Sequence, residues 1–401
     1  MRVRRLVGKL LLGLVSLGLG LLVVNALLAW WVPLDTLFQP DDELLFTTRP
    51  GARRVTMMDE RVGGEWIPIR LNEDGMRGPS LAELDEQRGT RRRILVLGDS
   101  MVFGENVRED ATFVHRLALE CAALGQPTQT VNAGVTGYGP DQALLKLERD
   151  FDRVKPDAVL LVLCATNDFG DLVRNKLFEL DEAGELVPFA NQLDPLALEA
   201  FAAAERDANR PALVRLWSVV AERRQARAGR RQAGSGAPDY IAEYLLAARA
   251  HFMEISVARD PRVYSLFEDI YDADVAIHPD WPSARAKIAL MRALLRRYDE
   301  RCAAWGIPWS VLVVPSAVDL CEDFAVRVDQ ERWPSYSPDR LAGTLVELCE
   351  ELEVPVVDLT QPFQSAGAKS LFVGADDFHW NAAGQALAAR VNARELVGEP
   401  R

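Results

Sequence analysis

Four short stretches of this 401-residue chain carry side chains whose types suit acyl transfer. In chain order they are Gly98-Asp99-Ser100, the loop from Asn132 to Gly139, Asn167-Asp168, and Asp376-Asp377-Phe378-His379. A serine hydroxyl becomes a good nucleophile only when a neighbouring base takes its proton. Histidine is the side chain whose ordinary pKa suits that role near neutral pH. The pattern therefore predicts Ser100 as the nucleophile and His379 as its base.

The predicted base needs a carboxylate that fixes its tautomer and orientation. Asp376 precedes His379 by three residues, a spacing that places both on one short turn, whereas Asp377 is a competing candidate two residues away. The spacing of three favours Asp376.

The tetrahedral intermediate of acyl transfer also needs hydrogen-bond donors for its oxyanion, and loss of one donor typically costs about 3–4 kcal/mol. We expect three donors: the backbone N–H of Ser100, the backbone N–H of Gly137 and the side-chain amide of Asn167. Other polar residues are expected to be structural or solvated rather than catalytic: Asp99, Asp168, His115, His251 and His278.

The elements that must position these stretches are continuous apolar runs separated by helical patterns. Runs without polar alternation predict strands that are buried on both faces. Such runs lie at 94–97, 158–163 and 309–314, and two further strands are predicted at 128–132 and 354–358. Strands that alternate with helices predict an α/β domain, a three-layer sandwich around a five-stranded parallel sheet. Ligands bind beyond the carboxyl ends of such strands, which is where the four stretches lie.

The predicted α/β domain comprises residues 91–168 and 284–398, and two further segments flank or interrupt it. Residues 35–90 are predicted to be a lead-in with short strands. Residues 169–283 are predicted to be a helical insertion, with helices at 195–228 and 240–258 separated by a flexible break at 233–238. An insertion at this edge of the sheet is placed to cap the site, and the alternative is a surface excursion without a catalytic role.

The N-terminal segment predicts a membrane anchor. Residues 10–34 contain no charge, and this length is sufficient to cross a bilayer as a helix. The basic residues that precede the segment place the N-terminus in the cytoplasm: Arg2, Arg4, Arg5 and Lys9. A cleaved signal peptide is the alternative, but the apolar run is long for one and lacks a small-x-small site. We therefore expect the rest of the chain to lie outside the cytoplasmic membrane.

The net charge of −13 argues against nucleic acid as a partner and against tight docking on anionic lipid. The five cysteines show no metal-type spacing, so the sequence implies neither a metal nor an organic cofactor. Cys121 and Cys164 are expected in the core. A bridge between two of Cys302, Cys321 and Cys349 stays open, as does the oligomeric state.

The four stretches resemble the sequence blocks of the SGNH (GDSL-type) hydrolase superfamily over about 90–168 and 305–395. Ser100 matches the nucleophile of the first block and Gly137 the oxyanion glycine of the second. Asn167 matches the oxyanion asparagine of the third block, and Asp376 with His379 matches the final Asp-x-x-His. The resemblance implies a flavodoxin-like α/β/α fold and an esterase, lipase, deacetylase or O-acyltransferase activity.

Within the superfamily, the anchor, residues 72–78 and His379-Trp380-Asn381 resemble bacterial membrane-tethered members. Two positions depart from the usual pattern. Ala165 replaces the glycine of Gly-x-Asn-Asp, and Trp380 stands where many hydrolases carry proline. A tryptophan after the histidine also occurs in SGNH-like polysaccharide O-acetyltransferases.

The sequence thus predicts a membrane-anchored extracytoplasmic serine esterase that forms an acyl-serine intermediate. Its expected substrates are O-acyl groups of envelope glycans or lipids. One alternative is a polysaccharide O-acetyltransferase with the same triad, which is less favoured because a single span cannot deliver cytoplasmic acyl donors. A second alternative is an inactive tethered binding or scaffold protein.

Overall fold

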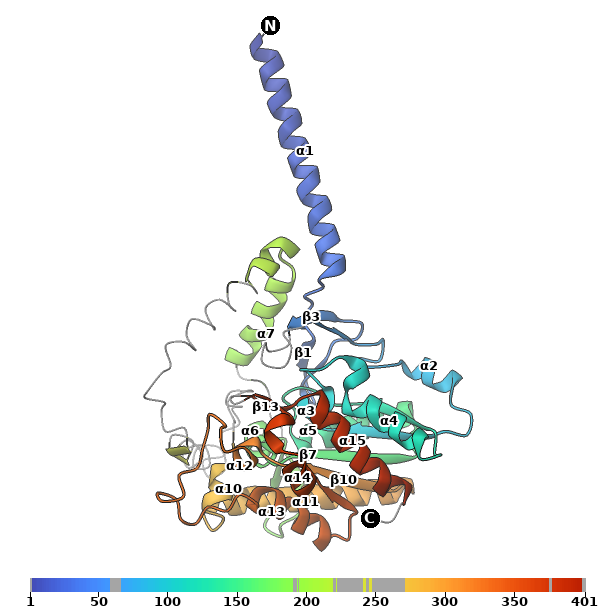
Figure 1. The fold of residues 1–401 in the computed structure, drawn as a ribbon, viewed down its shortest axis with the longest axis vertical. Helices are drawn as coiled ribbons and strands as arrows, with labels where there is room; N and C mark the ends of the chain where they lie inside the picture. The colour runs from blue at the N-terminus through green and yellow to red at the C-terminus, as the bar shows by residue number, and fades with distance from the viewer. Residues whose placement is uncertain are drawn as a thin grey trace.

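The computed structural model describes residues 2–57, 66–189, 193, 195–218, 221, 241–242, 245–246, 271–374 and 377–398. Its centre is a five-stranded parallel sheet between two layers of helices (Figure 1). The strands are β5 (Arg92–Leu97), β6 (Thr128–Asn132), β7 (Ala158–Cys164), β10 (Trp309–Val314) and β11 (Val356–Asp358). Their spatial order is β6-β5-β7-β10-β11. When the five strands are numbered along the chain, this is the order 2-1-3-4-5 of flavodoxin-like sheets. The predicted fold class is confirmed.

Burial explains why the central strand β7 lacks polar alternation. All seven residues of the central strand β7 are buried, and its neighbour β10 pairs with it from Trp309↔Val159 to Val314↔Cys164. Both strands therefore end at the same level, which brings the loops that follow them to one edge. The edge strand β11 begins two residues later than predicted, directly after Pro355, which has no N–H to donate.

The helices on the two faces follow the winding of the chain. On one face, α4 (Phe113–Ala123) packs against α15 (Ala382–Val397). On the other, α11 (Pro282–Trp305) lies against α5 (Pro140–Val154) and α13 (Arg340–Glu351). Shorter helices occupy the connections: α2 (Leu81–Glu86), α3 (Ser100–Phe103), α6 (Asp168–Asn175), α10 (Ala273–Ile277), α12 (Ala317–Leu320) and α14 (Thr360–Ser365).

The lead-in forms two antiparallel hairpins, β1 (Phe38–Asp41) with β2 (Leu45–Thr48) and β3 (Arg53–Met57) with β4 (Trp66–Arg70). It is attached to the α/β domain by Arg77, which is almost fully buried. The guanidinium donates to the carbonyls of Phe103 at 3.0 Å, of Val107 at 2.6 Å and of Gly104. These carbonyls lie at and just after the end of α3, so the lead-in fixes the helix that begins with Ser100.

The insertion contains a β-hairpin that its helical pattern did not predict. After α6, β8 (Phe178–Leu180) pairs with β9 (Leu186–Pro188), and α7 (Pro195–Ala208) follows. Residues 212–218 are also helical. The break at 233–238 and nearly all of the expected helix at 240–258 lie outside the described residues. Helix α7 packs against the lead-in, with the Phe201 and Phe46 ring centroids 6.0 Å apart.

All five cysteines are free thiols buried in the structure, so Cys302, Cys321 and Cys349 form no bridge with one another. Burial raises the pKa of the Cys321 thiol to about 11. A thiol with such a pKa is almost entirely protonated near neutral pH and therefore a poor nucleophile.

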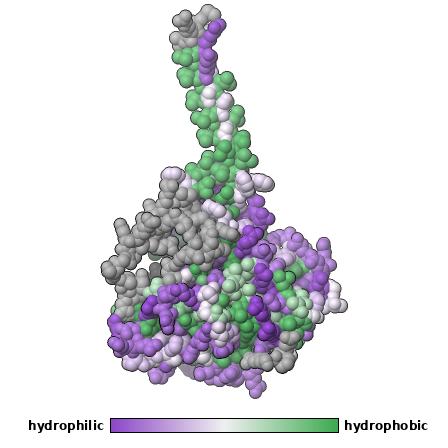
Figure 2. Space-filling model, in the orientation of Figure 1, coloured by the Kyte–Doolittle hydropathy of each residue, from purple (hydrophilic) through white to green (hydrophobic). Residues whose placement is uncertain are grey.

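Helix α1 (Arg2–Trp31) extends away from the rest of the molecule (Figure 1). Its segment Arg5–Trp31 is long and apolar enough to cross a membrane, by length and composition. The helix exposes apolar side chains along its length, as the hydropathy colouring of Figure 2 shows. In water this surface is unfavourable, which makes the helix a candidate membrane span.

The buried Arg77 generates a prediction about stability. Arg77→Ala leaves three buried or partly buried carbonyls without their donor, so we expect the free energy of unfolding to fall by about 3 kcal/mol. Urea unfolding of the full chain in detergent, followed by tryptophan fluorescence, measures the change. Arg108→Ala is the control, because Arg108 is exposed and pairs with the exposed Asp110, and it should change stability by less than about 0.5 kcal/mol. Equal stability of the two variants would contradict the prediction.

Candidate active site

The predicted nucleophile lies at a sharp turn between β5 and α3. Gly98 has φ 153°, and a Cβ there would approach Val102 Cγ2 to 2.7 Å and the Val162 carbonyl to 2.9 Å. Asp99 caps α3 by accepting the Met101 N–H at 2.8 Å. Ser100 is therefore the first helical residue at the carboxyl edge of the sheet, with only 6% of its surface exposed.

His379 reaches this turn from the C-terminal part of the chain. It lies on β13 (Asp377–Trp380), which pairs with β12 (Phe372–Gly374). Its Nε2 is 2.8 Å from Ser100 Oγ, and its Nδ1 is 2.6 Å from Asp377 Oδ1. The same carboxylate oxygen also accepts the backbone N–H of His379 at 3.0 Å. Serine, imidazole and carboxylate thus form one hydrogen-bonded row.

The carboxylate in this row is Asp377, whereas the sequence favoured Asp376, which lies outside the described residues. The physical reason is the local conformation. The spacing of three assumed a turn before His379, but residues 377–380 form a strand, and in a strand residues two apart share a face. Asp377 and His379 therefore point to the same side.

Trp380, one of the two departures from the usual motif, points to the other face of β13 and is fully buried. Its indole N–H donates to the carbonyl of Met101 at 2.9 Å, and its ring lies 5.5 Å from that of Phe113. Asn381 then caps α15 by accepting the N–H groups of Ala383 and Gly384. The residue after the histidine thus connects β13 directly to the helix that carries Ser100.

The loop that contains Gly137 lies beside the Ser100 turn. The N–H of Val135 donates to the Gly98 carbonyl at 3.1 Å. Gly134 lies so close to α3 that a Cβ would come within 2.5 Å of the Phe103 nitrogen. Gly137 follows in this loop with φ 81°.

Asn167 is the N-cap residue of α6 and is 8% exposed. Its Nδ2 donates to Asp171 Oδ2 at 2.8 Å. Arg174, on the same helix, is 2.7 Å from Asp171 Oδ1 and donates to the Gly137 carbonyl at 2.9 Å. The Asp171–Arg174 pair therefore ties the loop of Gly137 to the side chain of Asn167.

Sequence reasoning missed this pair. The available signal was weak, consisting of an acidic and a basic residue three apart just after the Asn167 block, a spacing that also occurs on solvated helix faces. What distinguishes the pair is its burial, with Arg174 only 6% and Asp171 0% exposed.

The electrostatics of the site raise the pKa of His379. Burial lowers the pKa of His379, but the hydrogen bond and charge of Asp377, together with the charges of Glu105 and Asp99, raise it above the ordinary 6.5. Burial raises the pKa of Asp99, although its hydrogen bond from the Met101 N–H opposes the shift. Asp168, predicted to be structural, accepts the Cys164 N–H at 2.7 Å, and burial raises its pKa well above the ordinary value.

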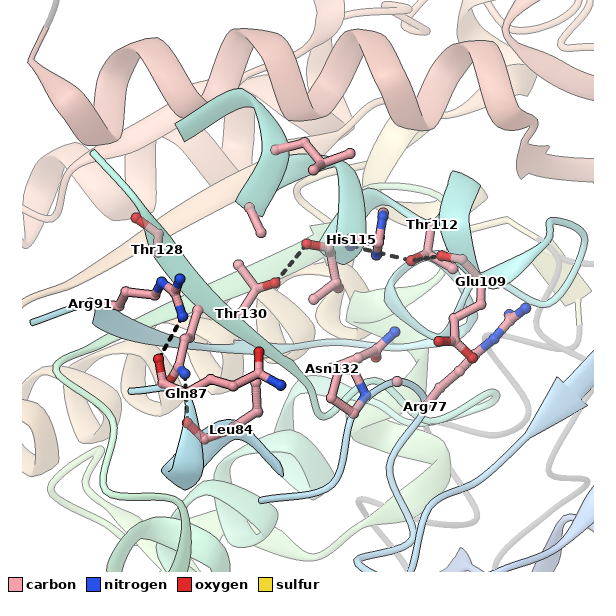
Figure 3. Close-up of a pocket in the computed structure, with 16 residues that line it drawn as sticks. Arg77, Leu84, Gln87, Arg91, Glu109, Thr112, His115, Thr128, Thr130 and Asn132 are labelled. Atoms are coloured by element: carbon pink, nitrogen blue, oxygen red, sulfur yellow. Dashed lines mark hydrogen bonds between the residues drawn. The ribbon is translucent and has the colours of Figure 1, made fainter. Parts of the chain in front are cut away.

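Of the remaining histidines, the structure describes His115 and His278. His278 stacks on Trp281 at 4.1 Å, and His251 lies outside the described residues. His115 lines a separate hollow of about 240 Å³ between α2, α4 and β6 (Figure 3). Several polar groups of this hollow are hydrogen-bonded within its own lining, for example Thr130 to the Val114 carbonyl and Gln129 to the Leu84 carbonyl. Among the described residues, no cluster of three or more His, Cys, Asp or Glu could hold a metal ion.

Comparison with known proteins adds one family match. Residues 271–401, which include His379, match the family described as SGNH hydrolase-like domain, acetyltransferase AlgX. Among curated proteins, none matches the chain.

Several solved structures are similar to the chain at low identity. A lipase/acylhydrolase from Enterococcus faecalis is 14% identical with a TM-score of 0.38, over 77% of this chain and 97% of the other. A mutant of Axe2, an acetylxylan esterase from Geobacillus stearothermophilus, is 12% identical with a TM-score of 0.38, over 77% and 95%. The esterase EstA from Pseudoalteromonas sp. is 12% identical with a TM-score of 0.36, over 76% and 96%.

TM-scores this low support no conclusion about activity. The family match rests on the C-terminal third of the chain, and the sheet has the strand order that the resemblance implies. The C-terminal third of the chain therefore matches an SGNH hydrolase-like family, in agreement with the resemblance that the motifs indicate.

Proposed function

We propose that this protein is a serine-dependent acyl-ester hydrolase. The observation that carries the proposal is the hydrogen-bonded row Ser100–His379–Asp377, with distances of 2.8 Å and 2.6 Å. His379 Nε2 takes the Ser100 proton while Oγ attacks the ester carbonyl, and then gives this proton to the departing alcohol. Water next attacks the acyl-serine, with His379 taking its proton and returning a proton to Ser100. Asp377 keeps the Nδ1 tautomer and stabilises the imidazolium.

The oxyanion is held in this proposal by the N–H groups of Ser100 and Gly137 and by the amide of Asn167. The side-chain amide nitrogen of an asparagine carries two hydrogens. One hydrogen of Asn167 Nδ2 is directed to Asp171, which leaves the second for the substrate. Asp171 and Arg174 act as positioning residues, because they set the separation of the Gly137 and Asn167 loops.

The proposed location is the outer side of the cytoplasmic membrane, with α1 as an uncleaved anchor. Support comes from the apolar segment Arg5–Trp31 and from the basic residues at the start of the chain. The proposed substrates are O-acyl groups of envelope glycans or lipids, because an anchored site meets esters close to the membrane.

A second candidate is an O-acetyltransferase. The observation that favours it is the family match, whose description names an acetyltransferase and whose range contains His379. Both reactions pass through an acyl-serine and differ in whether water or a carbohydrate hydroxyl attacks it. The transferase requires a site that positions the hydroxyl and excludes water.

The first prediction separates the two aspartates. Ser100→Ala and His379→Ala should abolish turnover of short p-nitrophenyl esters by the full chain in detergent. Asp377→Asn should lower kcat by about 10⁴-fold, because the imidazole loses the carboxylate that fixes its tautomer. Asp376→Asn is the matched control and should retain most of the activity. A larger loss in Asp376→Asn than in Asp377→Asn would return the orienting role to Asp376.

The second prediction concerns pH. His379 must be neutral to accept a proton, and its pKa is raised, so kcat/KM should fall on the acid side with an apparent pKa above 6.5. Asp377→Asn removes the charge that raises this pKa while burial still lowers it, so the acid limb should move to lower pH. Glu105→Gln removes a charge that raises the pKa of His379 less than Asp377 does, so it should move the acid limb less. An acid limb that stays in place in Asp377→Asn would contradict the assignment.

The third prediction distinguishes hydrolase from transferase. The full chain is incubated with an acetyl-ester donor and oligosaccharide acceptors, and products are quantified by mass spectrometry. We expect acetate to form faster than acetylated oligosaccharide, with both absent in Ser100→Ala. Acetylated oligosaccharide that outpaces acetate would establish the second candidate instead.

A further inference from the structure

The segment that follows α7 has an inverted distribution of polar and apolar side chains. Residues 211–218 read Pro-Ala-Leu-Val-Arg-Leu-Trp-Ser, and 212–218 are helical. Leu213, Val214 and Trp217 are exposed, with 69% of the Trp217 surface accessible, while Arg215 is 8% exposed. The segment thus presents apolar side chains outward and turns its one charge inward, the opposite of a helix on a soluble domain.

Two hydrogen bonds hold this segment, one to the domain-proximal part of α1 and one to the chain just after it. The N–H of Leu213 donates to Asn25 Oδ1 at 3.3 Å, and Arg215 donates to the Leu34 carbonyl at 2.9 Å. In Figure 1 the upper end of the green segment that contains α7 lies near the lower end of α1. On α1, Asn25, Leu28 and Ala29 are partly covered, a spacing of three and four that marks one helix face.

The contact with Asn25 sets the depth of the segment. A helix rises 1.5 Å per residue, so Asn25 lies about 9 Å nearer the membrane centre than Trp31 if α1 spans the bilayer. A hydrocarbon core of about 30 Å accommodates about 20 residues. If that core begins just after the basic residues of the N-terminus, Asn25 and Leu213 lie near its outer boundary, where Trp30 and Trp31 form the expected aromatic belt.

We propose that residues 211–218 lie in the headgroup–acyl boundary of the outer leaflet and form a second membrane contact beside α1. This inference rests on the membrane span of the proposed function. The apolar face of 211–218 then contacts lipid, and Asn25, a polar residue in the span, receives a hydrogen-bond donor. The charged residues of the preceding turn, Asp207 and Arg210, form an ion pair at 2.9 Å. The exposed side chains of Leu213, Val214 and Trp217 are apolar, so this surface fits the acyl region of a lipid and can bind a zwitterionic one.

The test uses single cysteine substitutions in the full chain, because all five native cysteines are buried free thiols. Trp217→Cys and Val214→Cys place an environment-sensitive nitrobenzoxadiazole label on the proposed contact. Leu22→Cys labels the exposed surface of α1, and Leu119→Cys labels an exposed position on α4 in the α/β domain. The proteins are reconstituted in phosphatidylcholine nanodiscs with or without nitroxide-bearing lipids, and circular dichroism verifies that each is folded.

We expect lipid nitroxides to quench the labels at 217 and 214 nearly as strongly as at 22, with a blue-shifted emission, and to leave the label at 119 unaffected. Labels at 217 and 214 that behave like the one at 119, while 22 is quenched, would overturn the second contact and leave the span intact. Absence of quenching at 22 as well would overturn both the span and the inference. The label at 214 leaves Trp217 in place, so it shows whether loss of the Trp217 side chain itself displaces the segment.

Discussion

The geometry of the candidate site depends on one hydrogen bond, from the indole of Trp380 to the carbonyl of Met101. Ser100 and His379 are 279 residues apart, and each lies on an element of four residues, α3 or β13. Trp380 is fully buried and its donor needs a partner, so the indole can occupy its pocket only when β13 lies against α3. The packing of α15 on α4 reinforces the contact between β13 and α3, and Gln385 accepts the Phe113 N–H at 2.5 Å. The imidazole then has little freedom except to face Ser100.

The parts of the molecule that the sequence predicts well are those whose residues carry the signal locally. A parallel strand buried on both faces is mostly apolar, so the runs in β5, β7 and β10 could be recognised from their composition alone. The turn at Gly98 and the histidine before α15 follow from motifs of a few residues. The choice between Asp376 and Asp377 had no such local signal. It depends on whether the residues around His379 pair with β12 as a strand or form a turn.

Other features could not be predicted because their residues acquire meaning only through tertiary contacts. The Asp171–Arg174 pair has an ordinary helical spacing, and its importance comes from the Gly137 carbonyl, 37 residues earlier in the chain. Arg77 reads as one charge in a polar lead-in, yet its buried guanidinium joins the lead-in to the end of α3. In both cases a buried guanidinium joins backbone segments that the apolar pattern leaves unconnected. The departure at Trp380 is likewise structural, since the ring fills the core beside Phe113.

The short junction between α1 and the first hairpin is held by backbone hydrogen bonds. Leu34, three residues after α1, is buried and bridges to Arg54, and the Asp35 N–H donates to the Arg53 carbonyl at 3.0 Å. The N–H of Val55 donates to the Pro33 carbonyl at 2.9 Å. A domain joined in this way is not connected to α1 by a flexible linker. With α1 in a bilayer, it would drift laterally at a constant height, so its encounters would be a search in two dimensions. Esters would be selected by their distance from the lipid surface before any chemical recognition begins.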